Sequence, residues 1–346
     1  PVGLFLAIKL SKLGHKVTLY EKKKWPIDKV CGQGIMPGGV KILEDLGIMF
    51  QNGIDSYDFT NIEYLDQEIS INGYLNASAK GVKRSILSQK LYQFALSCEQ
   101  LTLVPLSTLV DIKVTVDEKV EIKLEGINHK PVFDFVFACD GLHSKVRKIT
   151  NHERCRKGPY RMGARVHYSI SPWAEGVQVY WDQSVEAYVT PVSTNQIEIA
   201  FLWYQDIFSK EGQLIDKLLD RFPLLIKKLN NAKPDSDFKA YGPFKFNSST
   251  IHKDNIFYIG DCYKFLDGIT GEGLSLGFKQ ANIISENFEN FNYFDSMRIK
   301  LLYLNYGLWV NLCLILSRNK KIRSFLFYIV NKWPGIFNFI LKLNDF

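Results

Sequence analysis

The sequence has 346 residues, of which 46% are hydrophobic, and its formal net charge is +7. Such a chain can bury a sizeable core in one large or two ordinary domains. Its Lys and Arg residues are spread along the chain, which argues against a nucleic-acid partner. The cysteines form no C-x-x-C pair, so neither a disulfide framework nor a metal site is expected. No secretion signal opens the sequence, and a cytoplasmic location is the expectation.

A helix, a turn, a strand and an acid follow one another at the start of the chain. Residues 2–13, VGLFLAIKLSKL, have helical spacing and end before Gly14, and residues 17–20 favour a strand that closes on Glu21. This order is the second half of a dinucleotide-binding βαβ unit, in which Gly3 would allow close helix packing and Glu21 would bind ribose hydroxyls. The preceding strand and glycines are absent, so we expect an N-terminal truncation. A surface helix followed by a strand and an unrelated Glu would look the same.

Two further apolar runs, VFDFVFA at 132–138 and NIFYIG at 255–260, predict buried parallel strands. Each leads into an Asp and a Gly at the carboxyl edge, where open α/β sheets bind their ligands. Three separate segments therefore point to one crevice.

These segments resemble motifs of the FAD-dependent hydroxylase and reductase superfamily, which includes geranylgeranyl-reductase-like and halogenase-like flavoproteins. CDGLHSKVR at 139–147 resembles the DG motif, IGDCYKFLDGITGEG at 259–273 resembles the GD motif, and PVG with Glu21 resembles the end of the adenine-side fingerprint. KVCGQGIMPGGVKILEDLG and GVKRSILSQKL are similar to segments at corresponding positions. The likeness covers most of residues 1–290, and the joint order of these motifs is more specific than any one of them.

The resemblance implies an α/β fold with an FAD-binding Rossmann-like domain, an antiparallel β-sheet substrate domain and a helical C-terminal region. It places Glu21 on the adenosine ribose, Asp261 on a ribityl hydroxyl, and Arg84 at the start of a helix that reaches back toward the FAD. NAD(P)H is the implied reductant. The expected cofactor-binding residues are Gly3, Glu21, Lys22, Cys31, Gly32, Arg84, Asp140, Gly141, Gly260, Asp261, Gly268, Gly271, Glu272 and Gly273.

In the DG segment, the resemblance gives Asp140 and Gly141 a part both in holding the FAD and in admitting NAD(P)H. Gly141 would allow close backbone approach. Ser144 would cap the turn that carries Arg147.

The stretch GITGEGLSLGF at 268–278 combines several glycines with one acid. Thr270 is expected to cap a helix that starts near Gly271, with Glu272 in its first turn. Glycines there cost about 1 kcal/mol each relative to Ala, which makes sense if a flat isoalloxazine ring lies against the backbone. The helix N-terminus would stabilise negative charge on reduced flavin. The loop 263–270 lacks the His and adjacent prolines of the commonest hydroxylases, and looks more like reductase-like and polyketide-associated members.

Residues 151–250 read as short alternating strands, which predict an antiparallel sheet that covers the flavin. FTNIEYLDQEISING at 59–73 predicts a strand pair in the same sheet, and a substrate pocket is expected between the domains. The expected domains are 1–54, 82–150 and 251–290 for FAD binding, 55–81 and 151–250 for substrate binding, and 291–346 for the C-terminal helices.

His167 and Tyr188 are the candidate catalytic residues, because either could orient a substrate hydroxyl or protonate an intermediate. Aromatic strand residues are more often core than pocket, so packing is the alternative for each candidate. The residues expected to line the substrate pocket are Arg165, Trp181, Pro191 and Trp203.

The C-terminal part is expected to be helical and unusually apolar. A helix should run from Gly273 to about Phe288, and residues 301–317 then carry no charge, at the lower limit for a membrane span. Two interpretations are open. The helices either pack on the flavin domain, or make a peripheral membrane contact through residues 301–340 that feeds a lipophilic substrate.

The leading functional hypothesis is an NAD(P)H-dependent monooxygenase that hydroxylates an apolar, aromatic or polyketide-like small molecule. The first alternative is a geranylgeranyl-reductase-like flavoprotein that saturates isoprenoid double bonds. The second is a non-catalytic flavin- or lipid-binding protein associated with a membrane. Halogenation is disfavoured because the W-x-W-x-I-P signature is missing. Substrate identity, NADH against NADPH and the oligomeric state are left open.

Overall fold

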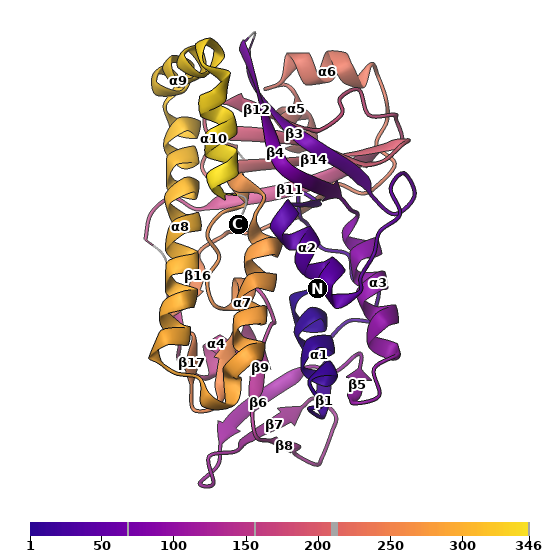
Figure 1. The fold of residues 1–346 in the computed structure, drawn as a ribbon, viewed down its shortest axis with the longest axis vertical. Helices are drawn as coiled ribbons and strands as arrows, with labels where there is room; N and C mark the ends of the chain where they lie inside the picture. The colour runs from indigo at the N-terminus through magenta and orange to yellow at the C-terminus, as the bar shows by residue number, and fades with distance from the viewer. Residues whose placement is uncertain (68, 156, 209–213, 345–346) are drawn as a thin grey trace.

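A computed structural model describes residues 1–67, 69–155, 157–208 and 214–344. Figure 1 shows a lower region of small sheets and helices, an upper region built on a large sheet, and a column of C-terminal helices along one side. Outside the large sheet and the C-terminal column, the elements include α1 (Val2–Lys12), β1 (Val17–Tyr20), α2 (Pro37–Leu46), α3 (Arg84–Leu96), β5 (Leu101–Val104), β6 (Leu109–Val114), β7 (Val120–Leu124), β8 (Val132–Phe133), β9 (Val136–Ala138), α4 (Lys145–Ile149), β17 (His252–Lys253), β18 (Ile256–Tyr258), η1 (Gly260–Cys262), η2 (Gly268–Thr270), α7 (Gly273–Asn287) and η3 (Phe288–Asn290).

The lower region holds parallel strand pairs, as expected from the sequence. β1 pairs with β5, and β9 pairs with β18, both in parallel. The helix and strand predicted at the start of the chain are confirmed as α1 and β1. The prediction of a single strand over 132–138 is wrong, because this segment forms two strands in different sheets. β8 pairs antiparallel with β7 in a separate sheet, and only β9 joins β18.

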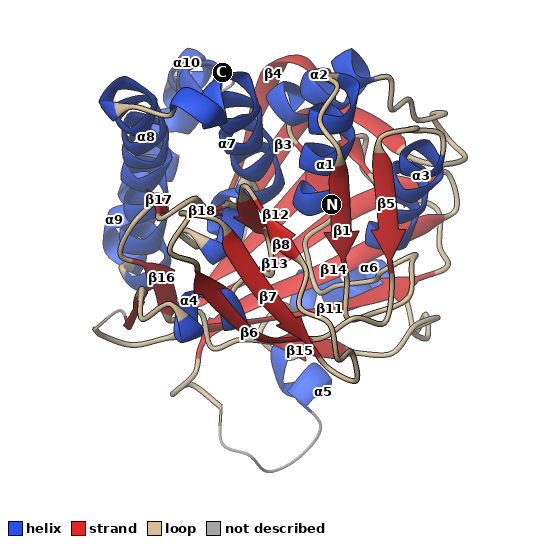
Figure 2. Cartoon of the chain, turned by 90° about the horizontal axis from the view of Figure 1, so that it is seen from below, coloured by secondary structure: helices blue, strands red, loops and turns tan. Residues whose placement is uncertain are grey.

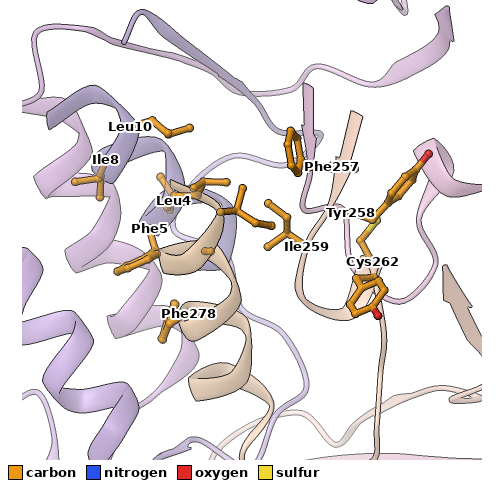
Figure 3. Close-up of a cluster of buried hydrophobic side chains, with 14 of the residues drawn as sticks. Leu4, Phe5, Ile8, Leu10, Phe257, Tyr258, Ile259, Cys262 and Phe278 are labelled. Atoms are coloured by element: carbon orange, nitrogen blue, oxygen red, sulfur yellow. The ribbon is translucent and has the colours of Figure 1, made fainter. Parts of the chain in front are cut away.

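Helices α1 and α7 pack closely beside β18, and this packing places the start of α7 next to the start of α1 (Figure 3). Gly277 makes the approach possible, because a Cβ there would lie 2.7 Å from a Val2 methyl carbon. One turn away, the rings of Phe5 and Phe278 lie 5.1 Å apart, and both side chains are fully buried. This contact brings two helix N-termini to one edge of the lower region.

The upper region is built on an eight-stranded sheet in the order β15-β11-β14-β13-β12-β3-β4-β2. Every neighbouring pair is antiparallel except β12 and β3. The pair predicted near 59–73 is therefore confirmed as part of this sheet. Its strands are β2 (Gly34–Ile35), β3 (Tyr57–Asp66), β4 (Ile69–Gly81), β11 (Arg161–Tyr168), β12 (Val177–Asp182), β13 (Val185–Ser193), β14 (Gln196–Tyr204) and β15 (Lys239–Tyr241), and the separate pair β10 (Glu153–Cys155) and β16 (Phe246–Ser248) lies outside it.

The two faces of the large sheet bury different clusters. One face packs on an outer core with residues of α5 (Leu214–Leu219) and α6 (Pro223–Leu229). The other face, here called the inner face, packs on residues of η2 and the C-terminal helices. Because successive side chains of a strand alternate between faces, neighbouring apolar residues of β13 and β14 such as Tyr188 and Val189, or Phe201 and Leu202, fall into different clusters.

The predicted C-terminal helices are confirmed as α8 (Tyr293–Arg318), α9 (Lys320–Lys332) and α10 (Pro334–Asn344). Figures 1 and 2 place them together at one side of the molecule. A buried ion pair joins α9 to β3, because Arg323 Nε donates to Asp66 Oδ2 at 2.9 Å and both side chains are almost fully buried. By length and composition alone, α8 could cross a membrane. Within its 18-residue stretch of highest hydropathy, 22% is buried inside the protein.

Candidate functional site

The start of α1 meets the ends of β1 and β9 at the predicted nucleotide half-motif. A Cβ at Gly3 would lie 3.2 Å from the Cβ of Cys139, which is tight, so glycine allows α1 to approach the end of β9. This confirms the packing role expected for Gly3. Glu21 follows β1, and its Oε1 accepts a hydrogen bond from the Lys23 amide at 3.0 Å. The neighbouring Lys22 is exposed.

Arg84 is the first residue of α3, as expected, and is 5% exposed. Within the described chain, its Nε and Nη1 atoms have no hydrogen-bond partner. Leaving buried charged donors unpaired is costly, which marks this position as one built to meet an anion or a polar ligand. Arg84, Lys29 and Asp261 lie close enough to affect one another's charge, because Arg84 lowers the pKa of Lys29 and both cations oppose the rise in the pKa of Asp261.

Lys29 and Asp261 belong to the same group of charges. The Lys29 ammonium lies 3.6 Å from the Cβ position of Gly141, in the DG turn. Desolvation by the surrounding walls lowers the pKa of Lys29, and Arg84 lowers it further. Desolvation raises the pKa of Asp261, although the residue is exposed to solvent, while Lys29 opposes that rise.

The DG segment forms a capped turn. Ser144 accepts a hydrogen bond from the Arg147 amide at 3.0 Å, which confirms the predicted cap. Asp140 Oδ2 also accepts from the backbone of this turn, at 2.7 Å from the Lys145 nitrogen. Gly141 has φ +80°, a conformation that favours glycine. Arg147 is fully buried, and its Nη1 donates to the Cys262 carbonyl at 2.8 Å, so the DG turn is tied to the GD segment.

The glycine stretch differs from expectation at its cap. Thr270 does not cap α7, whose N-cap residue is Glu272 without a side-chain cap. Asp267 instead accepts a hydrogen bond from the Ile269 amide at 3.0 Å and caps the preceding short helix η2. Gly271 then takes φ +72°, which ends η2, and α7 begins only at Gly273. The left-handed Gly271 therefore separates the short helix η2 from α7. No described atom lies within 4 Å of the Cβ position of Gly273, so the N-terminus of α7 has an open approach.

An ion cluster ties the η2 loop to the sheet. Arg161 donates to Glu186 and, at 3.3 Å, to Asp267, and all three side chains are nearly or fully buried. Burial raises the pKa of Glu186, and the Arg161 guanidinium opposes that rise. Tyr188 makes a second tie, because its hydroxyl donates to the Ile269 carbonyl at 2.7 Å. The candidate catalytic Tyr188 therefore positions the η2 loop.

His167 lies in a second buried polar cluster on the inner face. Its Nδ1 is 2.9 Å from Arg165 Nη1, and its Nε2 is 3.0 Å from Gln33 Oε1 and 3.6 Å from Glu198 Oε2. Burial, and then Arg165, lower the pKa of His167 to about 4, so the imidazole is neutral at pH 7. Burial raises the pKa of Glu198 well above its ordinary range. Both Glu198 oxygens lack a hydrogen-bond partner among the described residues.

The two candidate catalytic residues do not converge. Tyr188 and Arg165 are aligned with Ala200 on the strand between them, and His167 lies further along β11. Two strand spacings separate β11 from β13, about 10 Å. Tyr188 and His167 therefore lie at different places on the inner face. Arg165 also donates to Asp28, so its guanidinium is already committed within the protein.

Two of the expected pocket residues face away from the inner cluster. Trp203 belongs to the outer core and packs near Phe208, so its assignment to the pocket is wrong. Pro191 pairs with Ile197 of the outer core, and alternation places its side chain away from Thr190, whose hydroxyl donates to the Gly32 carbonyl at 3.1 Å. Trp181 does lie in the inner cluster, and its indole nitrogen has no partner among the described residues.

The family of the chain follows from comparison with known proteins. Residues 1–286 match a family described as FAD binding domain. The chain belongs to this family. FAD is therefore the cofactor expected for this chain.

Similar proteins extend the picture of the fold. One curated relative is conditioned medium factor receptor 1 of Dictyostelium discoideum, which is 23% identical over 82% of this chain and 61% of the relative, so this chain spans less than two thirds of it. The flavin-dependent brominase Bmp2 has a TM-score of 0.76 at 17% identity, over 100% of this chain and 91% of its own. PqsL from Pseudomonas aeruginosa, a probable FAD-dependent monooxygenase, has a TM-score of 0.70 at 15% identity, over 91% and 92%. At these identities, the likeness to solved structures shows the fold.

The residues present fit FAD. The unpaired Arg84 donors suit the charged or carbonyl oxygens of a dinucleotide, and Glu21 at the end of β1 suits ribose hydroxyls. Gly273 leaves the start of α7 open, where backbone N–H groups favour negative charge on a bound ring. Bound FAD would supply reversible electron transfer. Asp261 and Lys29, which affect each other's charge, belong to the same group as Arg84.

Several site residues were missed from the sequence. Lys29 and Gln33 lie within the quoted segment KVCGQG, beside the expected Cys31 and Gly32, but nothing in the spacing singled them out. Glu198 carried a usable signal, because it is the one acid within the apolar run QIEIAFLW. A lone acid in a strand buried on both faces must face a polar partner or be protonated.

Proposed function

We propose that this protein is an FAD-dependent oxidoreductase, and specifically an NAD(P)H-dependent monooxygenase that hydroxylates an apolar small molecule. One observation carries the proposal. The inner cluster of buried apolar residues packs the large sheet directly on the η2 loop, at Ile269. A substrate bound there would lie beside the flavin seat and away from water, as oxygenation by a reduced flavin requires.

The residues of the chain supply binding and orientation for this chemistry. The start of α7 favours the negative charge that reduction brings to the flavin. Tyr188 and Arg161 hold the η2 loop in place from the sheet. The neutral His167 is a candidate to bind or protonate the polar end of a substrate, because its buried cluster borders Gly32 and Gln33.

A reductase for isoprenoid double bonds is the second candidate, and a specific observation favours it. The inner cluster continues past Ile269 to Val310 of α8, Phe327 of α9 and Phe337 of α10. An extended apolar lining suits a prenyl chain better than a compact aromatic ring. This candidate uses the same reduced flavin without oxygen.

Oxygen consumption separates the two candidates. The full-length protein, loaded with FAD and supplied with NADPH or NADH, should consume oxygen faster when an aromatic or polyketide-like substrate is added, and should form a hydroxylated product. Anaerobic saturation of a prenyl substrate, with no substrate-dependent oxygen uptake, would favour the reductase. Absence of any flavin reduction by NADPH or NADH would instead favour a non-catalytic flavin protein.

A further inference from the structure

The outer surface of the C-terminal helices is apolar, although it is exposed. On α8, the exposed apolar side chains recur every three or four residues and so form one stripe along the helix, about 21 Å long at 1.5 Å per residue. The stripe consists of Leu301, Leu304, Leu308, Leu312 and Ile315, and the exposed side chains that extend it onto the following helices are Ile322, Phe325, Tyr328, Trp333, Ile336 and Phe339. A soluble helix normally places polar residues on its exposed face.

After the first turn of α8, where the buried Asp295 pairs with Arg298, the charged residues of these helices are all cations. Residues 296–344 contain no Asp or Glu. Lysine and arginine flank the apolar stripe at both of its ends and continue along α9 and α10, where long side chains can keep their charges at a polar boundary while apolar neighbours insert. The exposed cations are Arg298, Lys300, Arg318, Lys320, Lys321, Lys332 and Lys342.

The inner side of α8 is held by the protein along much of its length. Ile299 and Tyr303 are almost fully buried, and the Tyr303 hydroxyl donates to Gln280 of α7 at 2.8 Å. Arg323 fixes the turn between α8 and α9, because its Nη1 donates to the Leu316 carbonyl at 3.0 Å. A helix packed in this way on one side cannot be surrounded by lipid, so α8 is suited to lie on a membrane rather than to span it.

We propose that the outer face of α8, α9 and α10 docks on an anionic lipid bilayer surface. The charge supports this choice of occupant. An apolar stripe bordered by cations, with no acid, complements a surface of acidic headgroups over acyl chains. The buried side of the same helices contributes to the inner apolar cluster, so docking would bring that cluster within reach of lipophilic molecules. The inference does not depend on which reaction the flavin supports.

Vesicle co-sedimentation tests the proposal with the full-length protein. Binding should be strong to vesicles of equimolar phosphatidylcholine and phosphatidylserine and weak to phosphatidylcholine alone. Binding to the mixed vesicles should fall as salt rises from about 0.1 to about 1 M, because the Debye length shrinks from roughly 10 to 3 Å. Equal binding to both vesicle types at both salt concentrations would overturn the proposed charge recognition.

Paired substitutions test the surface itself. Leu304→Glu with Leu308→Glu should reduce binding to the mixed vesicles at least about tenfold, because two apolar contacts are lost and two anions are added. Their side chains are 56% and 61% exposed, so the fold should tolerate the change. Leu96→Glu with Val116→Glu, at positions 61% and 101% exposed on other surfaces, is the matched control and should bind as the unchanged protein does.

Three outcomes would refute the docking surface. The α8 variant could bind vesicles as well as the control does. The unchanged protein could form a dimer that the α8 variant disrupts, without vesicle binding, which would identify a second copy as the occupant. Finally, membrane-bound protein could resist extraction at alkaline pH, which would indicate a spanning helix. Circular dichroism of each variant establishes that a loss of binding is not a loss of fold.

Discussion

Gly273 is the residue at which the flavin seat can be tested most directly. The Cβ position of Gly273 meets no described atom within 4 Å, and its φ is not positive, so valine fits the protein without strain. Valine is a slightly better helix former than glycine, by about 0.4 kcal/mol. Gly273→Val should therefore leave the free energy of unfolding of the FAD-free protein within about 1 kcal/mol of its original value.

The same substitution should weaken FAD binding. Methyl carbons require about 3.5–4.0 Å from ring atoms, so a ring seated on the α7 N-terminus would have to move away from its backbone N–H groups. Losing hydrogen bonds to a charged or strongly polarised group costs about 1.5–3 kcal/mol. At 1.4 kcal/mol per factor of ten, this corresponds to a loss of roughly 10- to 150-fold in affinity.

The assay is a titration of the full-length, FAD-free protein with FAD, followed by flavin fluorescence and paired with urea unfolding. Gly335→Val is the matched control, because Gly335 also lies in the first turn of a helix, α10, and has no described atom within 4 Å of its Cβ position. The control should bind FAD as the unchanged protein does. Equal FAD affinity of the Gly273 variant, the control and the unchanged protein would refute the placement of the flavin at α7.

Three further predictions concern buried charges. Arg84→Met should raise the free energy of unfolding of the FAD-free protein, measured in urea, by about 1–2 kcal/mol, because unpaired buried donors are removed. The same variant should bind FAD more weakly in the titration described above. A lower free energy of unfolding would contradict the first expectation. Asp66→Ala should lower that free energy by about 3–5 kcal/mol, because it leaves the Arg323 guanidinium buried without a counter-ion, bonded only to backbone carbonyls, and a change below 1 kcal/mol in urea unfolding would show that the pair is solvated. Folding lowers the pKa of His167 from 6.5 to about 4. The stability that comes from this shift is therefore fully present above pH 6.5 and is lost as the pH falls toward 4. By linkage, the loss in the free energy of unfolding is on the order of 3 kcal/mol. His167→Gln should flatten the stability profile in that pH window, measured by urea unfolding at each pH, and an unchanged slope would place the titration elsewhere.

Local pattern determined much of the architecture. Helical spacing and a following glycine predict α1 and its end at Gly14, and alternation predicts the strands of the large sheet. The DG turn was also readable, because the Ser144 cap depends only on residues three positions apart. The order of the motifs led to the correct family, since each motif shapes its own short turn.

Contacts between distant segments were decided only by the tertiary structure. Trp203 and Tyr188 are both aromatic residues in apolar strands, and the sequence pattern did not show which face of the sheet would turn toward the flavin domain. The cap of the η2 loop also depends on a contact between segments that are far apart in the sequence. Asp267 is held by Arg161 from β11, more than a hundred residues earlier, and this ion pair positions the loop before α7 begins. Spacing along the chain encodes neither contact, because each depends on how the two regions pack against one another.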